Sequence, residues 1–231
     1  MSTLLYLASA VLLFASHAVP SWPGVRPALL GRLGRPGFIA LHSLLSVATL
    51  ALFVIAYQGA DTAGHLFFPA DGAAKLTAAL MPVALFLMLA RVTTKFGEPP
   101  APLPAAGIYR ITRFPGSMGL LLWALLHLQA TGDARRFILF ATMAAIALFA
   151  MVKNDWVLRH SPSPAAAAFR AETSAVPFAA ILSGRQRLIW REIGLGRVAG
   201  ALLLYAALLH AHPLVFGVDP LYWLPLIYWL P

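Results

Sequence analysis

Six long apolar runs with no Asp, Glu, Lys or Arg in their interiors dominate this chain of 231 residues. They fall at about 3–19, 36–58, 76–91, 114–131, 137–152 and 198–218. An apolar run of roughly 20 residues can cross the hydrocarbon core of a bilayer as a helix. A helix suits this solvent because all its backbone hydrogen bonds are internal. We therefore expect an all-α, polytopic transmembrane helical bundle of about six spans.

The composition supports a bilayer as the solvent. Only 11% of the residues are charged and 60% are hydrophobic, whereas soluble domains carry about 25% charged residues. A water-soluble chain of this composition could not cover its surface with polar groups. No segment outside the apolar runs is long enough to build a second core, so we expect one membrane domain over residues 1–231.

The net charge of +9 lies mainly in alternate loops, which is the pattern that orients membrane proteins. The first loop carries Arg26, Arg32 and Arg35 without an acid, and the third and fifth loops are also basic. This distribution predicts that these loops are cytoplasmic and that both termini are periplasmic. It argues against nucleic acid as the partner and favours the lipid bilayer.

The fifth loop, residues 153–197, is the longest polar segment. Its front half is predicted to turn at residues 161–164 and enter a short helix. Its back half, 181–193, mixes apolar residues with arginines, which favours the anionic membrane interface over an ordinary solvated linker. The tail 219–231 is rich in Tyr and Trp and interrupted by prolines, so we expect an interfacial anchor rather than a span.

Histidine is the only readily titrating residue type within the predicted spans. The sequence has no cysteine, which excludes disulfides, iron–sulfur clusters and covalently attached c-type haem. The absence of carboxylates from the spans disfavours an ion-coupled pump. The histidines in or near the spans are His17, His42, His127, His210 and His212.

Each of these histidines has three interpretations: a hydrogen bond between helices, metal or haem ligation, or proton transfer. His127 shares a helical face with Trp123, Gly116 and Gly119, which predicts a close helix approach and a flat space for a planar ligand. His42 shares a face with Ser46 and Thr49, which are alternative hydrogen-bond partners for it.

The chain resembles the NnrU family of bacterial membrane proteins along nearly its whole length. Five segments carry the likeness: His17–Arg26, Ile111–Pro115, Trp123–Asp133, Thr173–Leu182 and His212–Val218. The resemblance implies a bacterial inner-membrane protein linked to denitrification, in particular to nitric oxide reductase function. The family is in turn similar to 15-cis-zeta-carotene isomerase, a membrane enzyme that binds haem b.

That second likeness implies haem b held by His17 and His127, with Trp123, His42 and His212 as further cofactor-binding candidates. It leaves three functions open. The first is a haem-binding protein of nitrogen-oxide metabolism. The others are a haem-dependent isomerase of a polyene, which is a hydrophobic small molecule, and a non-enzymatic assembly factor for a respiratory reductase.

Two features conflict with a simple transfer of the family's properties. The family typically has Arg-His-Pro where this chain has Phe114 between Arg113 and Pro115, which argues against a methyltransferase reading. The predicted topology also puts His127 about 18 Å deeper than His17, at ~1.5 Å per residue. Depth alone pairs His17 with His42, and His127 with His210 or His212.

Overall fold

We examined a computed structural model of the chain, which describes residues 3–60, 64–94 and 105–224. This part of the chain is all-helical and contains no β-strand. The α-helices are α1 (Thr3–Ala18), α2 (Arg26–Gln58), α3 (Ala73–Thr93), α4 (Pro115–Ala130), α5 (Ala134–Arg159), α6 (Pro164–Glu172), α7 (Ala179–Leu182), α8 (Trp190–Ile193) and α9 (Leu195–Phe216), with a 3₁₀ turn, η1 (Gly107–Arg110).

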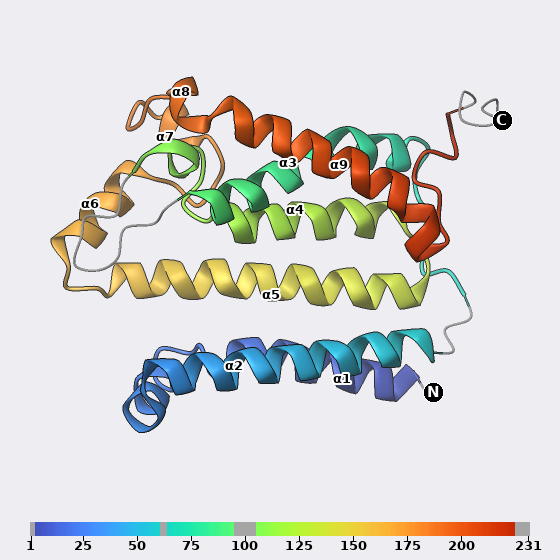
Figure 1. The fold of residues 1–231 in the computed structure, drawn as a ribbon, viewed down its shortest axis with the longest axis horizontal. Helices are drawn as coiled ribbons and strands as arrows, with labels where there is room; N and C mark the ends of the chain where they lie inside the picture. Colours follow the sequence, from blue (N-terminus) through green and yellow to red (C-terminus); the bar gives the residue numbers. More distant parts are fainter. Residues whose placement is uncertain (1–2, 61–63, 95–104, 225–231) are drawn as a thin grey trace.

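The long helices form a row in which α5 lies in the middle (Figure 1). On one side of α5, α1 packs against both α5 and α2. On the other side, α4 packs against α5, α3 against α4, and α9 against α3. The short helices α6, α7 and α8 lie at the end of the bundle where α5 finishes (Figure 1). Helix α1 begins and α9 ends at the other end of the bundle.

Six helices coincide with the six predicted apolar runs. Four of them, α2, α3, α5 and α9, are long and apolar enough to cross a bilayer, whereas α1 is a shorter apolar helix and α4 has 16 residues. Large apolar side chains lie exposed on these helices, for example Leu44 at 70% and Leu203 at 72%. A bilayer would cover such surfaces. The number of crossings and the side of the termini stay predictions.

Two clusters of buried residues hold the row together. Tyr6 and Leu13 of α1 pack with Phe53 of α2, and side chains of α5 cover them. Met81 and Ala84 of α3 pack with Leu126 of α4. The close helix approach predicted from Gly119 is confirmed, because a Cβ atom there would lie 2.7 Å from the Ala84 carbonyl oxygen of α3.

Two helices extend further than the sequence suggests. Helix α2 begins at Arg26 and passes through a kink at Gly34, whose φ of 66° is readily accessible only to glycine. The pattern Gly34-Arg35-Pro36 therefore marks a kink and not the start of the helix. Helix α5 continues through Lys153 to Arg159, so the fifth loop starts later than predicted. The short helix predicted after residue 164 is confirmed as α6. Residues 225–231 of the predicted anchor lie outside the described residues.

Candidate functional site

The end of α1 brings His17 close to His42 of α2. The centres of their rings are 6.0 Å apart, and the ring planes cross at 71°. The two helices are held together near this point by a hydrogen bond of 2.9 Å between the hydroxyl oxygens of Ser16 and Thr49. The two imidazoles form the candidate site, which we call the histidine pair.

The two imidazoles have different surroundings. The Nδ1 atom of His17 lies 3.0 Å from the Leu13 carbonyl oxygen, which leaves Nε2 free. A carbonyl at Nδ1 is the usual partner that orients a metal-ligating histidine. The Nδ1 atom of His42 is buried and has no hydrogen-bond partner in the described part of the chain. The predicted alternative, a hydrogen bond of His42 to Ser46 or Thr49, is therefore not present at this atom.

Aromatic and basic residues surround the histidine pair. Phe38 stacks on His42 with ring centres 5.8 Å apart, and the Arg26 guanidinium lies over the Phe38 ring, 5.6 Å from its centre. Lys153 of α5 lies within electrostatic range of both His42 and Arg26. The histidine pair therefore lies beside an apolar ring, Phe38, and near two positively charged side chains, Arg26 and Lys153.

His127 occupies a separate place between α4 and α5. Its ring stacks on Phe140 at 4.6 Å and lies 4.8 Å from Trp123, and its Nδ1 atom is 2.9 Å from the Trp123 carbonyl oxygen. The flat space predicted beside Trp123 is filled by Phe140, whose ring centre is 5.2 Å from that of Trp123. Gly116 lies against the Arg91 side chain of α3, and Gly119 lies against the α3 backbone at Ala84 and Met88, so neither faces a ligand-sized space.

The distance between the histidine pair and His127 can be estimated along α5, because α1 and His127 both pack on this helix. It runs parallel to α1, because Tyr6 donates to the Arg135 carbonyl near the start of both helices and Phe14 packs on Phe149 further along. His127 instead packs on Phe140. Nine residues separate Phe140 from Phe149, or about 14 Å at ~1.5 Å per residue. His17 lies beyond Phe14, so the structure does not bring His17 and His127 together.

The remaining predicted histidines lie at the other end of the bundle from the pair. The Nδ1 atom of His212 is 2.7 Å from the Val218 carbonyl oxygen, and its charge lies within electrostatic range of His127. The predicted grouping by depth put His17 with His42, and His127 with His210 or His212; the structure brings the first two together and, of the second set, places His212 in electrostatic interaction with His127. No group of three or more metal-ligating His, Cys, Asp or Glu side chains occurs among the described residues.

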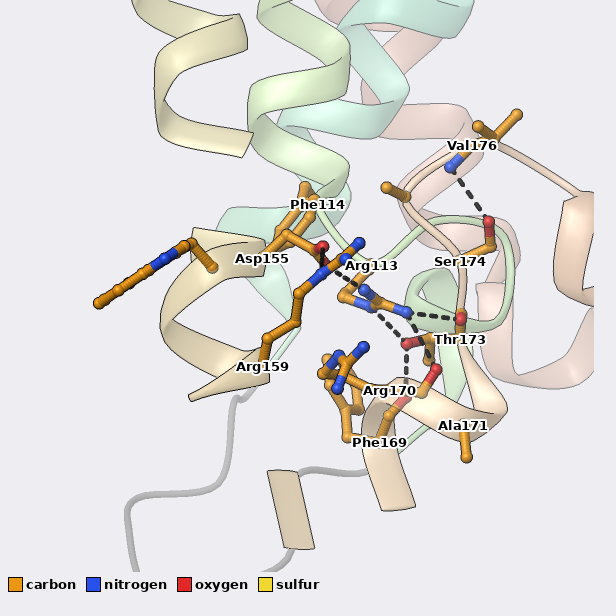
Figure 2. A network of polar contacts seen from close by, with 12 residues as sticks. Arg113, Phe114, Asp155, Arg159, Phe169, Arg170, Ala171, Thr173, Ser174 and Val176 are labelled. Atoms are coloured by element: carbon orange, nitrogen blue, oxygen red, sulfur yellow. Dashed lines mark hydrogen bonds and ion pairs between the residues drawn. The ribbon is translucent and has the colours of Figure 1, made fainter. Parts of the chain in front are cut away.

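A second polar site, which the sequence did not suggest, centres on Arg113 just before α4. Figure 2 shows its side chain pointing toward Asp155 of α5 and toward the loop after α6. Arg113 forms an ion pair with Asp155 and donates to the Thr173 side chain at 2.9 Å and backbone carbonyl at 2.8 Å. Burial lowers the pKa of the Arg113 guanidinium, and the Asp155 carboxylate opposes this shift. The neighbouring Phe114 provides an aromatic ring, whose centre is 5.9 Å from the guanidinium carbon.

A second ion pair fastens the loop before α9. Both Glu192 oxygens accept from Arg110, at 2.7 and 2.9 Å, and the Gly107 backbone N–H donates to Glu192 at 2.6 Å. These donors hold the pKa of Glu192 below its ordinary value. The same hydrogen bond to Glu192 raises the pKa of Arg110. Both ion pairs join segments that are far apart in the sequence. The sequence shows only that these charged residues lie next to apolar runs, which does not predict which of them pair.

These features define an all-helical membrane protein with a histidine pair between its first two helices. The NnrU protein family matches residues 5–220. The chain belongs to this family. It is also 34% identical over 82 residues to a maize (Zea mays) protein, 15-cis-zeta-carotene isomerase, chloroplastic. That likeness covers 36% of this chain and 22% of the maize protein, so the chain spans about a fifth of its relative. No solved structure matches the chain.

Proposed function

We propose that this protein binds haem b through His17 and His42 and acts in nitrogen-oxide metabolism in the bacterial inner membrane, in support of nitric oxide reductase. One observation carries the proposal: two imidazole rings lie 6.0 Å apart at the junction of α1 and α2. Imidazoles that hold one metal at ~2.0–2.1 Å each must be close neighbours, and these two rings would be near enough to do so.

His17 and His42 fit a haem iron better than His17 and His127, the two ligands that the resemblance implies. His17 has its Nδ1 atom on a carbonyl, which favours Nε2 as the ligand atom. The buried Nδ1 atom of His42 has no partner in the described chain, which is costly unless a ligand satisfies the ring. His127 does not fit as the second ligand of an iron bound to His17, because about 14 Å of α5 separates them.

The role of this chain's residues is to bind and orient the cofactor. Haem b supplies a redox-active iron, which can bind a nitrogen oxide or act as a Lewis acid at a double bond. Phe38 forms an apolar wall beside His42 and is only 8% exposed. The hydrogen bond between Ser16 and Thr49 fixes how α1 meets α2, and so the spacing of the two rings.

A second candidate function is the isomerisation of a polyene, favoured by the likeness to the maize isomerase. An open apolar groove is lined by Phe67, Phe68, Leu122, Leu125 and Gln129. Its α4 side chains are near His127, not near the histidine pair. A long apolar substrate that lay in this groove would contact Leu125 and Gln129 of α4, whereas His127 does not line the groove and packs on Phe140.

The experiment is a reduced-minus-oxidised difference spectrum of the detergent-purified full chain, followed by two functional assays. A b-type band together with altered nitric oxide reductase activity in a deletion strain supports the proposed function. A b-type band with conversion of a cis-polyene, lost when Leu125→Trp fills the groove, supports the second candidate. A haem-free protein that still restores reductase activity contradicts haem binding and favours a non-enzymatic assembly factor.

A further inference from the structure

Four basic side chains gather at the end of the bundle where α1 ends and α2 begins. Arg26 lies over Phe38, Phe38 stacks on His42, and His42 contacts His17. Lys153 of α5 is within electrostatic range of Arg26 and His42. We call Arg26, which is exposed, and the partly buried Lys153 the basic pocket; His42 lies beside them.

The basic pocket has no acidic residue to balance it in the described part of the chain. Neither Arg26 nor Lys153 takes part in the ion pairs of these residues. The nearest carboxylate along α5, Asp155, is already occupied by Arg113 and Arg159. Every charged neighbour that acts on His42 is itself basic. Like charges held together in a membrane protein are unfavourable unless an anion accompanies them.

The topology predicted from the basic loops puts the pocket at the cytoplasmic surface, where anionic lipid headgroups are available. The loop between α1 and α2 presents Val19 and Trp22 to the surroundings, at 55% and 52% exposure. Trp22 packs on Phe149 of α5, which keeps this loop beside the Lys153 end of that helix. Indole rings favour the headgroup level of a bilayer, and basic pockets between membrane helices on the cytoplasmic side bind lipid headgroups.

We propose that the basic pocket binds the phosphate of an anionic lipid headgroup. Arg26 donates from its guanidinium, which can contact two phosphate oxygens at once. Lys153 places a second positive charge from α5 on the other side of the phosphate. The ring of Phe38 holds the Arg26 side chain in place from below, with 5.6 Å between the guanidinium carbon and the ring centre. The lipid would thus join α2 to α5, which both pack on α1.

The test uses the purified full chain in nanodiscs of phosphatidylcholine, with or without an equal part of phosphatidylglycerol. Retained lipid is counted after transfer to detergent by native mass spectrometry. The double variant Arg26→Gln/Lys153→Gln should lose its preference for phosphatidylglycerol by about tenfold or more, given the effect of two cations at a charged interface. The control Arg32→Gln/Arg35→Gln removes the same charge further along α2. Because Arg26 is exposed like these two arginines, position and not exposure separates the variants, and the control should retain the preference.

Three results would overturn the proposal. Equal loss in both double variants would show general attraction to charge and no pocket. Competition by inorganic phosphate as strong as that by phosphatidylglycerol would identify free phosphate as the ligand. Loss of haem without loss of lipid preference would assign Arg26 and Lys153 to the haem carboxylates. Thermal unfolding of the unmodified protein provides a measurement that needs no variant: phosphatidylglycerol, and not phosphatidylcholine or phosphate, should raise its unfolding temperature.

Discussion

The ring of His17 contacts the ring of His42 with 6.0 Å between their centres, whereas His127 packs on Phe140 in another part of the bundle. The sequence places His17 and His42 25 positions apart, at the end of one apolar helix and within the next. Antiparallel packing of α1 on α2 brings them to the same depth (Figure 1). Because this packing also involves the buried residues Tyr6, Leu13 and Phe53, the geometry of the pair depends on the core between these helices.

Breaking the buried ion pair of Arg113 should strongly destabilise the protein. The Arg113 and Asp155 side chains are 8% and 14% exposed, so Asp155→Asn leaves a buried cation without its counter-charge. We expect a loss of about 3–5 kcal/mol in the free energy of unfolding, as for other broken buried pairs. Thermal unfolding in detergent measures it. Arg159→Gln is the matched control, because this arginine pairs with the same carboxylate but is 60% exposed; it should cost less than about 1 kcal/mol.

Gly119→Ala should disturb the packing of α3 on α4. The added Cβ atom would lie 2.7 Å from the Ala84 carbonyl oxygen and 2.8 Å from the Met88 side chain. We expect a loss of about 1–3 kcal/mol, as for other overpacked positions. The control is Gly196→Ala in α9, where the new atom meets nothing within 4 Å. If both variants unfold at the same temperature, the close contact between α3 and α4 is wrong.

The ion pair of Arg110 with Glu192 should make stability depend on pH in the acidic range. Arg110 and the Gly107 N–H hold the pKa of Glu192 below its ordinary value. The unfolded chain therefore binds a proton more readily, so this contribution is complete above the ordinary glutamate pKa of about 4.3 and is lost as pH falls through the lowered value. Denaturation from pH 7 to pH 3 should show a smaller acid loss in Glu192→Gln. An unchanged pH profile would contradict the pair.

Removing the hydrogen bond between α1 and α2 should loosen the histidine pair. Thr49→Val keeps the size of the side chain but removes the hydroxyl that contacts Ser16 at 2.9 Å. Such bonds between membrane helices contribute about 0.6 kcal/mol on average. We expect a small drop in unfolding temperature and weaker haem retention. Thr142→Val is the control, because the Thr142 hydroxyl bonds only to a carbonyl within its own helix.

Much of the fold could be predicted because the bilayer leaves few alternatives to apolar helices. All six runs are helices, and the depth argument correctly grouped His17 with His42. The kinked start of α2 was missed, since Gly34 and Pro36 usually end a helix. The Arg113 and Glu192 pairs could not be predicted, because each joins segments more than 40 positions apart through loop packing. The pairing of His17 with His127 came from the resemblance alone, and the depth of each helix argues against it.

The most direct test of the account is the haem content of three single variants, purified in parallel and measured as the pyridine haemochrome per mole of folded protein. We expect His17→Ala and His42→Ala each to lose most of the haem, because each would remove one of the two imidazoles proposed to hold the iron. His127→Ala should retain it, since that ring lies on Phe140 in another part of the bundle. Loss of haem in His127→Ala with full retention in His42→Ala would contradict the account.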